Sequence, residues 1–213
     1  MDAKKKINSF TNELIKGYGT LKVYKKNYYL FHEGDVAKKL YFIEKGLVKV
    51  SESTLEGQNI TFFLRKDNEL FGMSEIVLQK PRNRFAQCLT DSRVWEVDAN
   101  MFHELISNNH ELSFLFLQIA SQRLLQMQKN VGMLMSKPVS WRLAWLLTQF
   151  TKANNDTVSN CVVSIPLTHE EISNIVGCSR QTISETFNKW HKKKLIYYSN
   201  KEILIYDISK ILT

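Results

Sequence analysis

The spacing of hydrophobic positions changes near residue 100, and the change predicts two kinds of secondary structure. Before it, short apolar and aromatic clusters are separated by turn-forming sequences such as Glu33-Gly34-Asp35. The clearest clusters are residues 28–31, 40–43, 47–50, 60–63 and 94–97. Short strands separated by turns are typical of sandwiches and barrels. We therefore expect residues 1–99 to form a β-barrel or jelly roll.

After residue 100 the spacing becomes helical, with no proline and a single glycine up to residue 136. A seam of apolar residues repeats every seven positions, and it comprises Leu117, Ala120, Leu124, Met127, Val131 and Leu134. Such a seam favours pairing with an identical helix in a parallel coiled coil. A second apolar face, with Phe116 and Ile119, is available for the chain's own barrel. We expect a dimerisation helix; a single stripe would also suit a helix that only covers the barrel.

Ser136-Lys137-Pro138 is expected to end this helix and to form a hinge, since proline removes an N–H and restrains the preceding residue. An apolar helix over residues 138–150 should follow. Further along, residues 195–198 and 203–206 flank a polar turn and predict a hairpin. The predicted organisation is an N-terminal domain over 1–99, a long helix with its hinge over 100–136, and a C-terminal domain over 137–213.

Two short helices joined by a tight turn are predicted within the C-terminal domain. Thr168 and Glu171 have the spacing of a capping box, which starts the first helix. Gly177 can end that helix because a positive φ costs glycine little, and Ser179 can cap the second helix. This pattern, followed by the hairpin, indicates a winged helix-turn-helix.

The second helix has residue types that read base edges on its outer face. Arginine pairs with guanine, glutamine with adenine and glutamate with cytosine, whereas serine, threonine and lysine suit phosphates. The predicted DNA-contacting residues are Thr168, Ser179, Arg180, Gln181, Thr182, Ser184, Glu185, Asn188 and Lys189. A solvated helix without a ligand is the alternative. The adjacent lysines, the hairpin and the dimer seam favour double-stranded DNA.

Composition supports a DNA-binding protein of the cytoplasm. The net charge is +8, and residues 186–201 hold five lysines and no acid. No apolar run is long enough to span a membrane, and no secretory signal follows the first lysines, so a cytoplasmic protein is expected. The three cysteines lie far apart and lack zinc-site spacing, which indicates reduced thiols and no metal site.

The segment Ile175-Val176-Gly177-Cys178-Ser179-Arg180-Gln181-Thr182, in the order barrel, long helix, hinge and helix-turn-helix, resembles the Crp/Fnr superfamily of transcription regulators. Residues 41–50, Phe71-Gly72 and 81–84 are similar to the signature of cyclic-nucleotide-binding domains. The resemblance covers about residues 20–210 and implies an α+β fold. It also implies a homodimer on a pseudo-palindromic operator, an activator function and RNA polymerase as a partner.

The same resemblance gives roles to individual residues. Arg180 falls on the family position that contacts guanine. Gln181 stands where glutamate is usual, and Glu185 stands where arginine is frequent. We therefore expect a half-site that differs from the common one of the family.

The effector pocket also departs from the cAMP-binding pattern. Gly72-Met73-Ser74 replaces Gly-Glu-Leu, Arg84-Phe85 replaces Arg-Ser, and Met127 and Gln128 stand where the purine is contacted. Each buried polar group of cAMP left without its partner costs about 1–3 kcal/mol. The sequence therefore predicts no tight cAMP binding; the effector stays open and no cofactor is predicted.

Other chemistries fit less well. An iron–sulfur cluster needs four thiolates, and the chain has three cysteines. Haem ligation by His32, His103 or His110 and a thiol switch at Cys88 or Cys178 stay open, although structural roles are the simpler interpretation. The rival function is a cupin-like or other small-molecule-binding barrel without DNA. It needs clustered histidines and acids, and the barrel offers only His32 and dispersed acids, so no catalytic residue is predicted.

Overall fold

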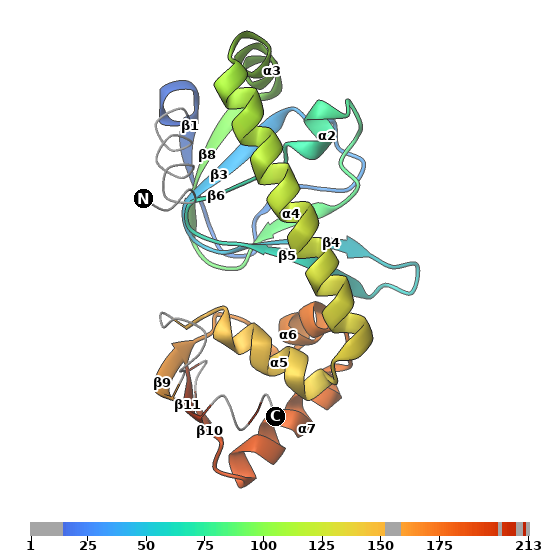
Figure 1. The fold of residues 1–213 in the computed structure, drawn as a ribbon, viewed down its shortest axis with the longest axis vertical. Coiled ribbons are helices and arrows are strands. Elements are labelled where there is room, and N and C mark those ends of the chain that lie inside the picture. Colours follow the sequence, from blue (N-terminus) through green and yellow to red (C-terminus); the bar gives the residue numbers. More distant parts are fainter. Residues whose placement is uncertain (1–14, 152–158, 200–201, 208–210, 212–213) are drawn as a thin grey trace. The chain divides into compact units, whose positions relative to one another are not determined.

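A computed structural model of the 213-residue chain describes residues 15–151, 159–199, 202–207 and 211. The chain divides into two compact units, Met1–Leu124 and Leu125–Thr213. The boundary between them falls within one helix, α4 (His110–Ser136) (Figure 1).

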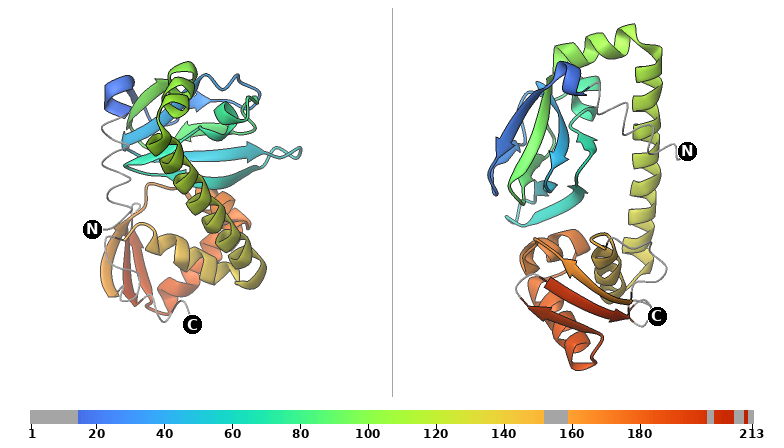
Figure 2. Two further views of the ribbon diagram at one scale, coloured as in Figure 1. Left: turned by 45° about the horizontal axis from the view of Figure 1, so that its top comes forward. Right: turned by 90° about the vertical axis from the view of Figure 1, so that its left-hand side faces the viewer.

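The first unit is built on two four-stranded antiparallel sheets, with strand orders β1-β8-β3-β6 and β2-β7-β4-β5. Figure 2 shows these strands from two further sides. Their bounds are β1 Thr20–Tyr24, β2 Tyr29–Phe31, β3 Lys39–Lys45, β4 Val48–Ser53, β5 Asn59–Arg65, β6 Glu69–Phe71, β7 Phe85–Cys88 and β8 Ser92–Asp98. Among the described residues the sheets do not close into a barrel. The predicted jelly-roll class is confirmed in this open, jelly-roll-like form.

Strand β3 explains why residues 40–43 are continuously apolar. Tyr41 and Ile43 join a core in which side chains of both sheets meet, so the sheets face each other. Leu40 and Phe42 point to the opposite face and join a second core. That second core is completed by the helices and includes Ile76, Phe102, Leu112, Leu115 and Phe116. A strand buried on both faces cannot show the polar alternation of a half-exposed strand.

The helical segment predicted after residue 100 consists of two helices. Helix α3 (Ala99–Asn108) is capped by Asp98, whose carboxylate accepts a hydrogen bond from the Asn100 N–H at 2.8 Å. Asn109 then adopts an extended backbone with φ −136° and ψ 104°. Its side-chain oxygen accepts from the Leu112 N–H at 3.1 Å and caps the start of α4. Helix α4 is 27 residues long. The apolar spacing continues across this break, so it does not indicate the cap that the Asn109 side chain forms.

The second unit matches the predicted order of elements. Its bounds are α5 Val139–Thr148, β9 Ser159–Ser164, α6 His169–Val176, α7 Arg180–Lys192, β10 Ile196–Ser199 and β11 Glu202–Asp207. The predicted hairpin is observed as β10 and β11, and β9 adds a third strand in the order β10-β11-β9. The turn of the predicted hairpin, at residues 200–201, lies outside the described residues. Together with the first unit, this arrangement confirms the predicted α+β class.

A single arginine on α5 joins three segments of the second unit. Arg142 donates through Nε to the Val176 carbonyl at 3.0 Å and through Nη2 to the Gly177 carbonyl at 3.2 Å. Its Nη1 donates to the carbonyls of Leu134 at 3.3 Å and Lys137 at 3.1 Å. The guanidinium therefore holds the last turn of α4 and the residues before α5 against the end of α6. The proposed hinge at residues 136–138 lies beside this contact and stays a prediction.

Candidate DNA interface and effector pocket

The first helix of the two-helix unit starts as the sequence indicates. The Thr168 hydroxyl accepts from the Glu171 N–H at 3.2 Å, and the Glu171 carboxylate accepts from the Thr168 N–H at 2.6 Å. At the other end Gly177 has φ 74° and ψ 57°, in the left-handed region. The capping box and the glycine turn are therefore both confirmed, and they set the direction in which α7 leaves.

Helix α7 is capped by Ser179, whose hydroxyl accepts from the Thr182 N–H at 3.0 Å. The Ser179 and Thr182 hydroxyls also contact each other at 2.8 Å. Both hydroxyls therefore organise the first turn of the helix. A phosphate contact by either residue stays a prediction.

One face of α7 is buried and the other is exposed. Ile183, Phe187 and Trp190 pack into the core of the unit. The exposed side chains include five of the predicted DNA-contacting residues, namely Arg180, Gln181, Glu185, Asn188 and Lys189. The helix therefore presents these five residue types together on its outer side.

Three of these exposed residues have side-chain partners within the unit. The Gln181 amide nitrogen donates to a Glu185 carboxylate oxygen at 2.8 Å. The Asn188 side-chain oxygen accepts from the Tyr198 hydroxyl of β10 at 3.1 Å. Ser184 differs from the others because it is half-buried. Its hydroxyl donates to the Arg180 carbonyl at 3.2 Å, and its oxygen lies 2.9 Å from Nδ1 of His169.

His169 is a residue of this site that sequence reasoning did not single out. Its ring stacks on Phe187 with 5.2 Å between centroids, which places it between α6 and α7. Burial, and then the positive charge of Arg180, lower the pKa of His169 below 6.5. The neutral imidazole is therefore the favoured form at neutral pH, and its contact with Ser184 ties the two helices together.

Lysines continue the interface beyond the outer face of α7. Lys192, Lys193 and Lys194 are exposed at its C-terminal end, where positive charge also interacts favourably with the helix dipole. Lys201, the fifth lysine of the predicted cluster, lies outside the described residues. The exposed outer face of α7 therefore has Arg180 at its N-terminal end and positively charged lysines at its C-terminal end.

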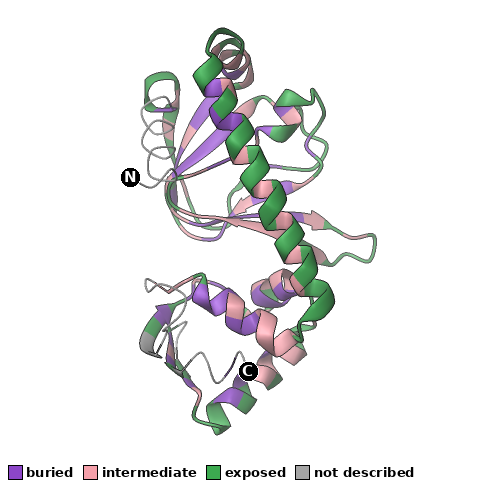
Figure 3. Ribbon diagram, in the orientation of Figure 1, coloured by how far each residue is buried: buried purple, intermediate pink, exposed green. Residues whose placement is uncertain are grey.

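The predicted dimer seam on α4 is largely uncovered. Leu117, Leu124, Val131 and Leu134 expose 60%, 61%, 47% and 51% of their surface. Ala120 is exposed as well, and Met127 is half-buried. Figure 3 shows α4 in green, the colour of exposed residues, over most of its length. Within the single chain this apolar row therefore has little cover.

The glycine of the predicted effector pocket is held by an arginine that has a structural role. Gly72 has φ 79°, and its carbonyl accepts from Nη1 of Arg82 at 2.7 Å. The same nitrogen donates to Glu75 at 3.0 Å, and the guanidinium lies 4.3 Å from the Phe31 ring centroid. Arg82 is buried and its contacts are internal to the first unit.

Arg84 has neighbours from its own chain as well. Its guanidinium lies 4.1 Å from the Phe62 ring centroid, and its Nε is 3.8 Å from a Glu52 carboxylate oxygen. Next to it along β7, Phe85 is buried, and so is Met73 in the turn after Gly72. Ser74 is exposed. Met127 and Gln128 lie on the part of α4 that belongs to the second unit.

The comparisons with known proteins agree with this architecture. Residues 21–109 match the family model described as cyclic nucleotide-binding domain, and residues 142–212 match the Crp-like helix-turn-helix domain. Relatives include the global nitrogen regulator of Nostoc sp., 26% identical over 189 residues, with 87% of this chain and 85% of the relative covered. The chain belongs to the Crp/Fnr superfamily of transcription regulators.

Other Crp/Fnr relatives differ in the effector that their names record. A CRP-like cAMP-activated global transcriptional regulator of Mycobacterium tuberculosis is 26% identical over 183 residues, covering 85% of this chain and 82% of the relative. Among solved structures, the c-di-GMP-responsive global regulator of Xanthomonas campestris has a TM-score of 0.78 at 18% identity, with 93% and 99% of the two chains covered. FixK2 of Bradyrhizobium japonicum also has a TM-score of 0.78, at 15% identity with 91% and 95% covered. The structural matches show the shared fold.

Two half-buried arginines of the first unit were not singled out from the sequence. Arg123 of α4 donates to the Leu70 carbonyl, and burial followed by the charge of Arg65 lowers its pKa to about 10. Burial likewise lowers the pKa of Arg65, which lies 3.6 Å from Glu69. These arginines come from a helix and a strand that are far apart in the sequence. Residue patterns alone could not have paired them.

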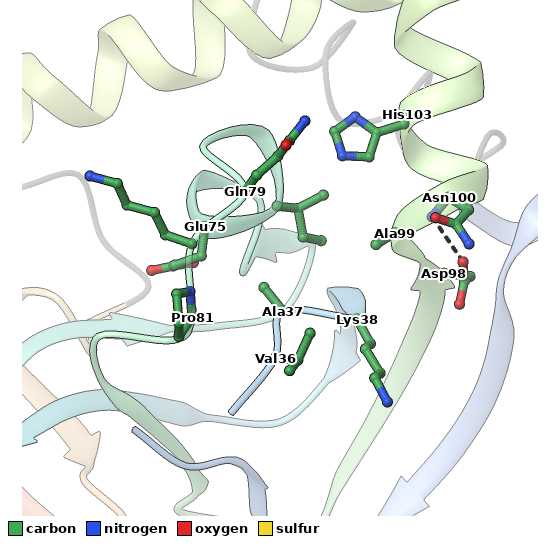
Figure 4. A pocket seen from close by; sticks show the side chains of 12 residues that line it. Val36, Ala37, Lys38, Glu75, Gln79, Pro81, Asp98, Ala99, Asn100 and His103 are labelled. Atoms are coloured by element: carbon green, nitrogen blue, oxygen red, sulfur yellow. Dashed lines mark hydrogen bonds between the residues drawn. The ribbon is translucent and has the colours of Figure 1, made fainter. Parts of the chain in front are cut away.

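A cavity of about 540 Å³ opens elsewhere in this unit (Figure 4). It lies between the turn around α2 (Ser74–Val77) and the start of α3. Its lining includes Lys38, Glu75, Gln79, Asp98 and His103. None of the predicted effector residues lines it. The cavity is therefore distinct from the residues that the Crp/Fnr resemblance assigns to an effector.

The described thiols have the character of structural cysteines. Cys88 is buried, and burial raises its pKa to about 11. Burial also raises the pKa of Cys178, which is half-buried beside Arg142. High pKa values disfavour the reactive thiolate. Among the described residues, no three histidine, cysteine or acidic side chains are grouped as metal ligands. No helix in the described ranges is long and apolar enough to cross a membrane.

Proposed function

We propose that this chain is a homodimeric, cytoplasmic transcription activator that reads a pseudo-palindromic operator without requiring cAMP, and that it has no enzymatic activity. The observation that carries the proposal is the outer face of α7. It presents Arg180, Gln181 and Glu185 to solvent and ends in exposed lysines. Arginine, glutamine and glutamate are side chains that read bases in the major groove, and lysines neutralise phosphates.

The exposed seam of α4 supports the dimer. Apolar residues at seven-residue spacing gain most when they pack against the same residues of a second helix. Leu117, Leu124 and Val131 would be covered in that arrangement. A dimer presents two α7 helices, which suits two half-sites about one turn of DNA apart.

Independence from cAMP is supported by the surroundings of Arg84. Phe62 stacks on its guanidinium and Glu52 lies close by, so the arginine already has an aromatic and an acidic neighbour. A bound phosphate would meet the repulsion of that carboxylate. Met73 and Phe85 provide neither the carboxylate nor the hydroxyl that the cAMP-binding pattern supplies.

The activator role and the contact with RNA polymerase rest on the family. Relatives from Mycobacterium tuberculosis and Haemophilus influenzae are named cAMP-activated global transcriptional regulators. We propose the same regulatory role for this chain. We do not transfer the cAMP response, which belongs to those relatives. The cupin-like alternative is not favoured, because residues 21–109 match the cyclic nucleotide-binding domain and residues 142–212 match the Crp-like helix-turn-helix domain.

Electrophoretic mobility shifts with the DNA upstream of the chain's own gene test the proposal. We expect a specific complex at moderate salt without cAMP. Arg180→Ala should abolish the preference for this DNA over unrelated DNA while the dimer persists, because Arg180 would contact a base. Lys193→Ala should weaken binding to all sequences alike. It should also reduce the slope of log binding constant against log salt concentration by about one, because one fewer counterion is released.

Two outcomes would contradict the proposal. A specific complex that forms only after cAMP is added would overturn the independence from cAMP. The absence of any specific complex with or without cAMP, on this DNA and on a randomised library, would overturn the DNA-binding role itself.

A further inference from the structure

Gln181 and Glu185 occupy the middle of the exposed face of α7. They lie four residues apart and therefore next to each other on the helix surface, on the side opposite the buried Ile183. Both side chains are exposed, and 2.8 Å separates the Gln181 amide nitrogen from the Glu185 carboxylate oxygen.

The hydrogen bond fixes which atoms remain available. A carboxylate only accepts hydrogen bonds, so the amide nitrogen of Gln181 must face Glu185. The amide oxygen of Gln181 and the second carboxylate oxygen of Glu185 accept no hydrogen bond from the described part of the chain. Glu185 takes one of the two N–H groups of the Gln181 amide, so the pair offers two oxygen acceptors, one remaining donor and a net negative charge.

Acceptors and negative charge restrict what this pair can bind on DNA. Phosphate oxygens are acceptors and negatively charged, so they are repelled. In the major groove, adenine N6 and cytosine N4 are amine donors, whereas guanine O6 and thymine O4 are acceptors. An exocyclic amine is therefore the group that complements the pair.

We infer that Gln181 and Glu185 act as one acceptor unit that selects an exocyclic amine, of adenine or cytosine, beside the base contacted by Arg180. The inference rests on the proposed function and specifies its base preference. Arg180 donates hydrogen bonds, whereas the oxygens of the pair accept them. Arg180 therefore suits a base with acceptors, and the pair suits a neighbouring base with an amine donor. Lys189, four residues after Glu185, is exposed and offsets the repulsion between the carboxylate and nearby phosphates.

Selection from a randomised pseudo-palindromic library tests this inference on the full-length chain. Every base pair has one exocyclic amine in the major groove, so the contrast lies in which strand carries it. At one position of each half-site, wild type is expected to enrich pairs with adenine or cytosine on one fixed strand by about tenfold over the same pairs reversed. Gln181→Ala and Glu185→Ala should each remove that preference. Lys193→Ala is the matched control, because it should weaken binding while it leaves the base preference unchanged.

A change of a single functional group identifies the contact. In the selected operator, the amino group of the preferred base is replaced by hydrogen, with purine in place of adenine or pyrimidin-2-one in place of cytosine. Wild-type affinity should fall about tenfold. The Gln181→Ala/Glu185→Ala double variant should show no further loss. The base whose replacement matters distinguishes adenine from cytosine.

The results separate this inference from the proposed function. Enrichment that depends on Arg180, combined with an unchanged affinity when the amino group at the position sensitive to Gln181 and Glu185 is replaced by hydrogen, would overturn the acceptor unit alone. So would enrichment that neither substitution alters. If wild type enriches no sequence, the proposed function fails and the inference fails with it. Circular dichroism of each variant verifies that α7 is folded.

Discussion

Gly177 and Gly132 are both in the second unit, but the backbone requires glycine at only one of them. Gly177 has φ 74°, in the left-handed region that disfavours every residue with a Cβ. A Cβ built there would lie 3.6 Å from the Leu134 side chain, which is ordinary contact, so the cost is conformational. Gly132 lies within α4, and a Cβ there would meet nothing within 4 Å.

The same chemical change should therefore have opposite signs at these two positions. Gly177→Ala is expected to lower the free energy of unfolding of the second unit by about 1–2 kcal/mol. Gly132→Ala should raise it by about 0.5–1 kcal/mol, because alanine is the better helix former. Urea unfolding followed by circular dichroism measures both. A stabilising Gly177→Ala would show that the turn relaxes to another conformation.

Local residue chemistry was predictable, whereas contacts between distant segments were not. The capping box of Thr168 and Glu171 follows from a spacing of three residues, so the sequence was sufficient. The four carbonyls that Arg142 binds belong to three segments, and no pattern around residue 142 indicates them. Gln181 and Glu185 have a spacing that allows pairing, but the spacing does not show which way the Gln181 amide faces.

At the scale of elements, α4 combines two kinds of apolar residue. Leu112, Leu115 and Phe116 are buried in the core of the first unit. Farther along, Leu124 and Leu125 are adjacent and almost equally exposed, at 61% and 59%. Only Leu124 belongs to the seven-residue seam. Exposure alone does not separate these two leucines. The heptad pattern does, because it assigns only Leu124 to the predicted dimer seam.

Leu124→Glu is expected to convert the dimer to a monomer, because it places a like charge against its copy in the pair of helices. The neighbouring Leu125→Glu should leave the dimer intact. Size-exclusion chromatography with light scattering measures the mass of each variant. If both variants remain dimeric, another surface must form the dimer. If wild type is monomeric, the seam has no such role.

The element boundaries show where pattern reasoning was incomplete. The long helix was expected from the absence of proline and from the apolar spacing, and α4 confirms it. The break at Asn109 depends on one side chain that caps the next helix. Strand β6 and helix α2 are three and four residues long, too short for a periodic signal. Their positions depend on the strands beside them.

At the scale of the whole molecule, effector binding can be measured as stability. A ligand present at 100 times its dissociation constant stabilises the folded state by about 2.7 kcal/mol. We expect millimolar cAMP to leave the melting temperature of this chain unchanged, because the resemblance to cAMP-binding domains predicts Met73 and Phe85 at positions where cAMP needs polar partners. Differential scanning fluorimetry measures the shift, and the cAMP-activated regulator of Mycobacterium tuberculosis is a suitable positive control. A rise of several degrees would contradict the prediction.

Arg142 on α5 should tolerate few substitutions when its codon is randomised. Exchange of arginine for lysine is usually among the mildest substitutions. Lysine, however, carries its three donors on one nitrogen and lacks the planar fork of five N–H groups. At position 142 it could not reach carbonyls of Leu134, Lys137, Val176 and Gly177 at once. The codons that survive at this position should therefore be almost exclusively those of arginine.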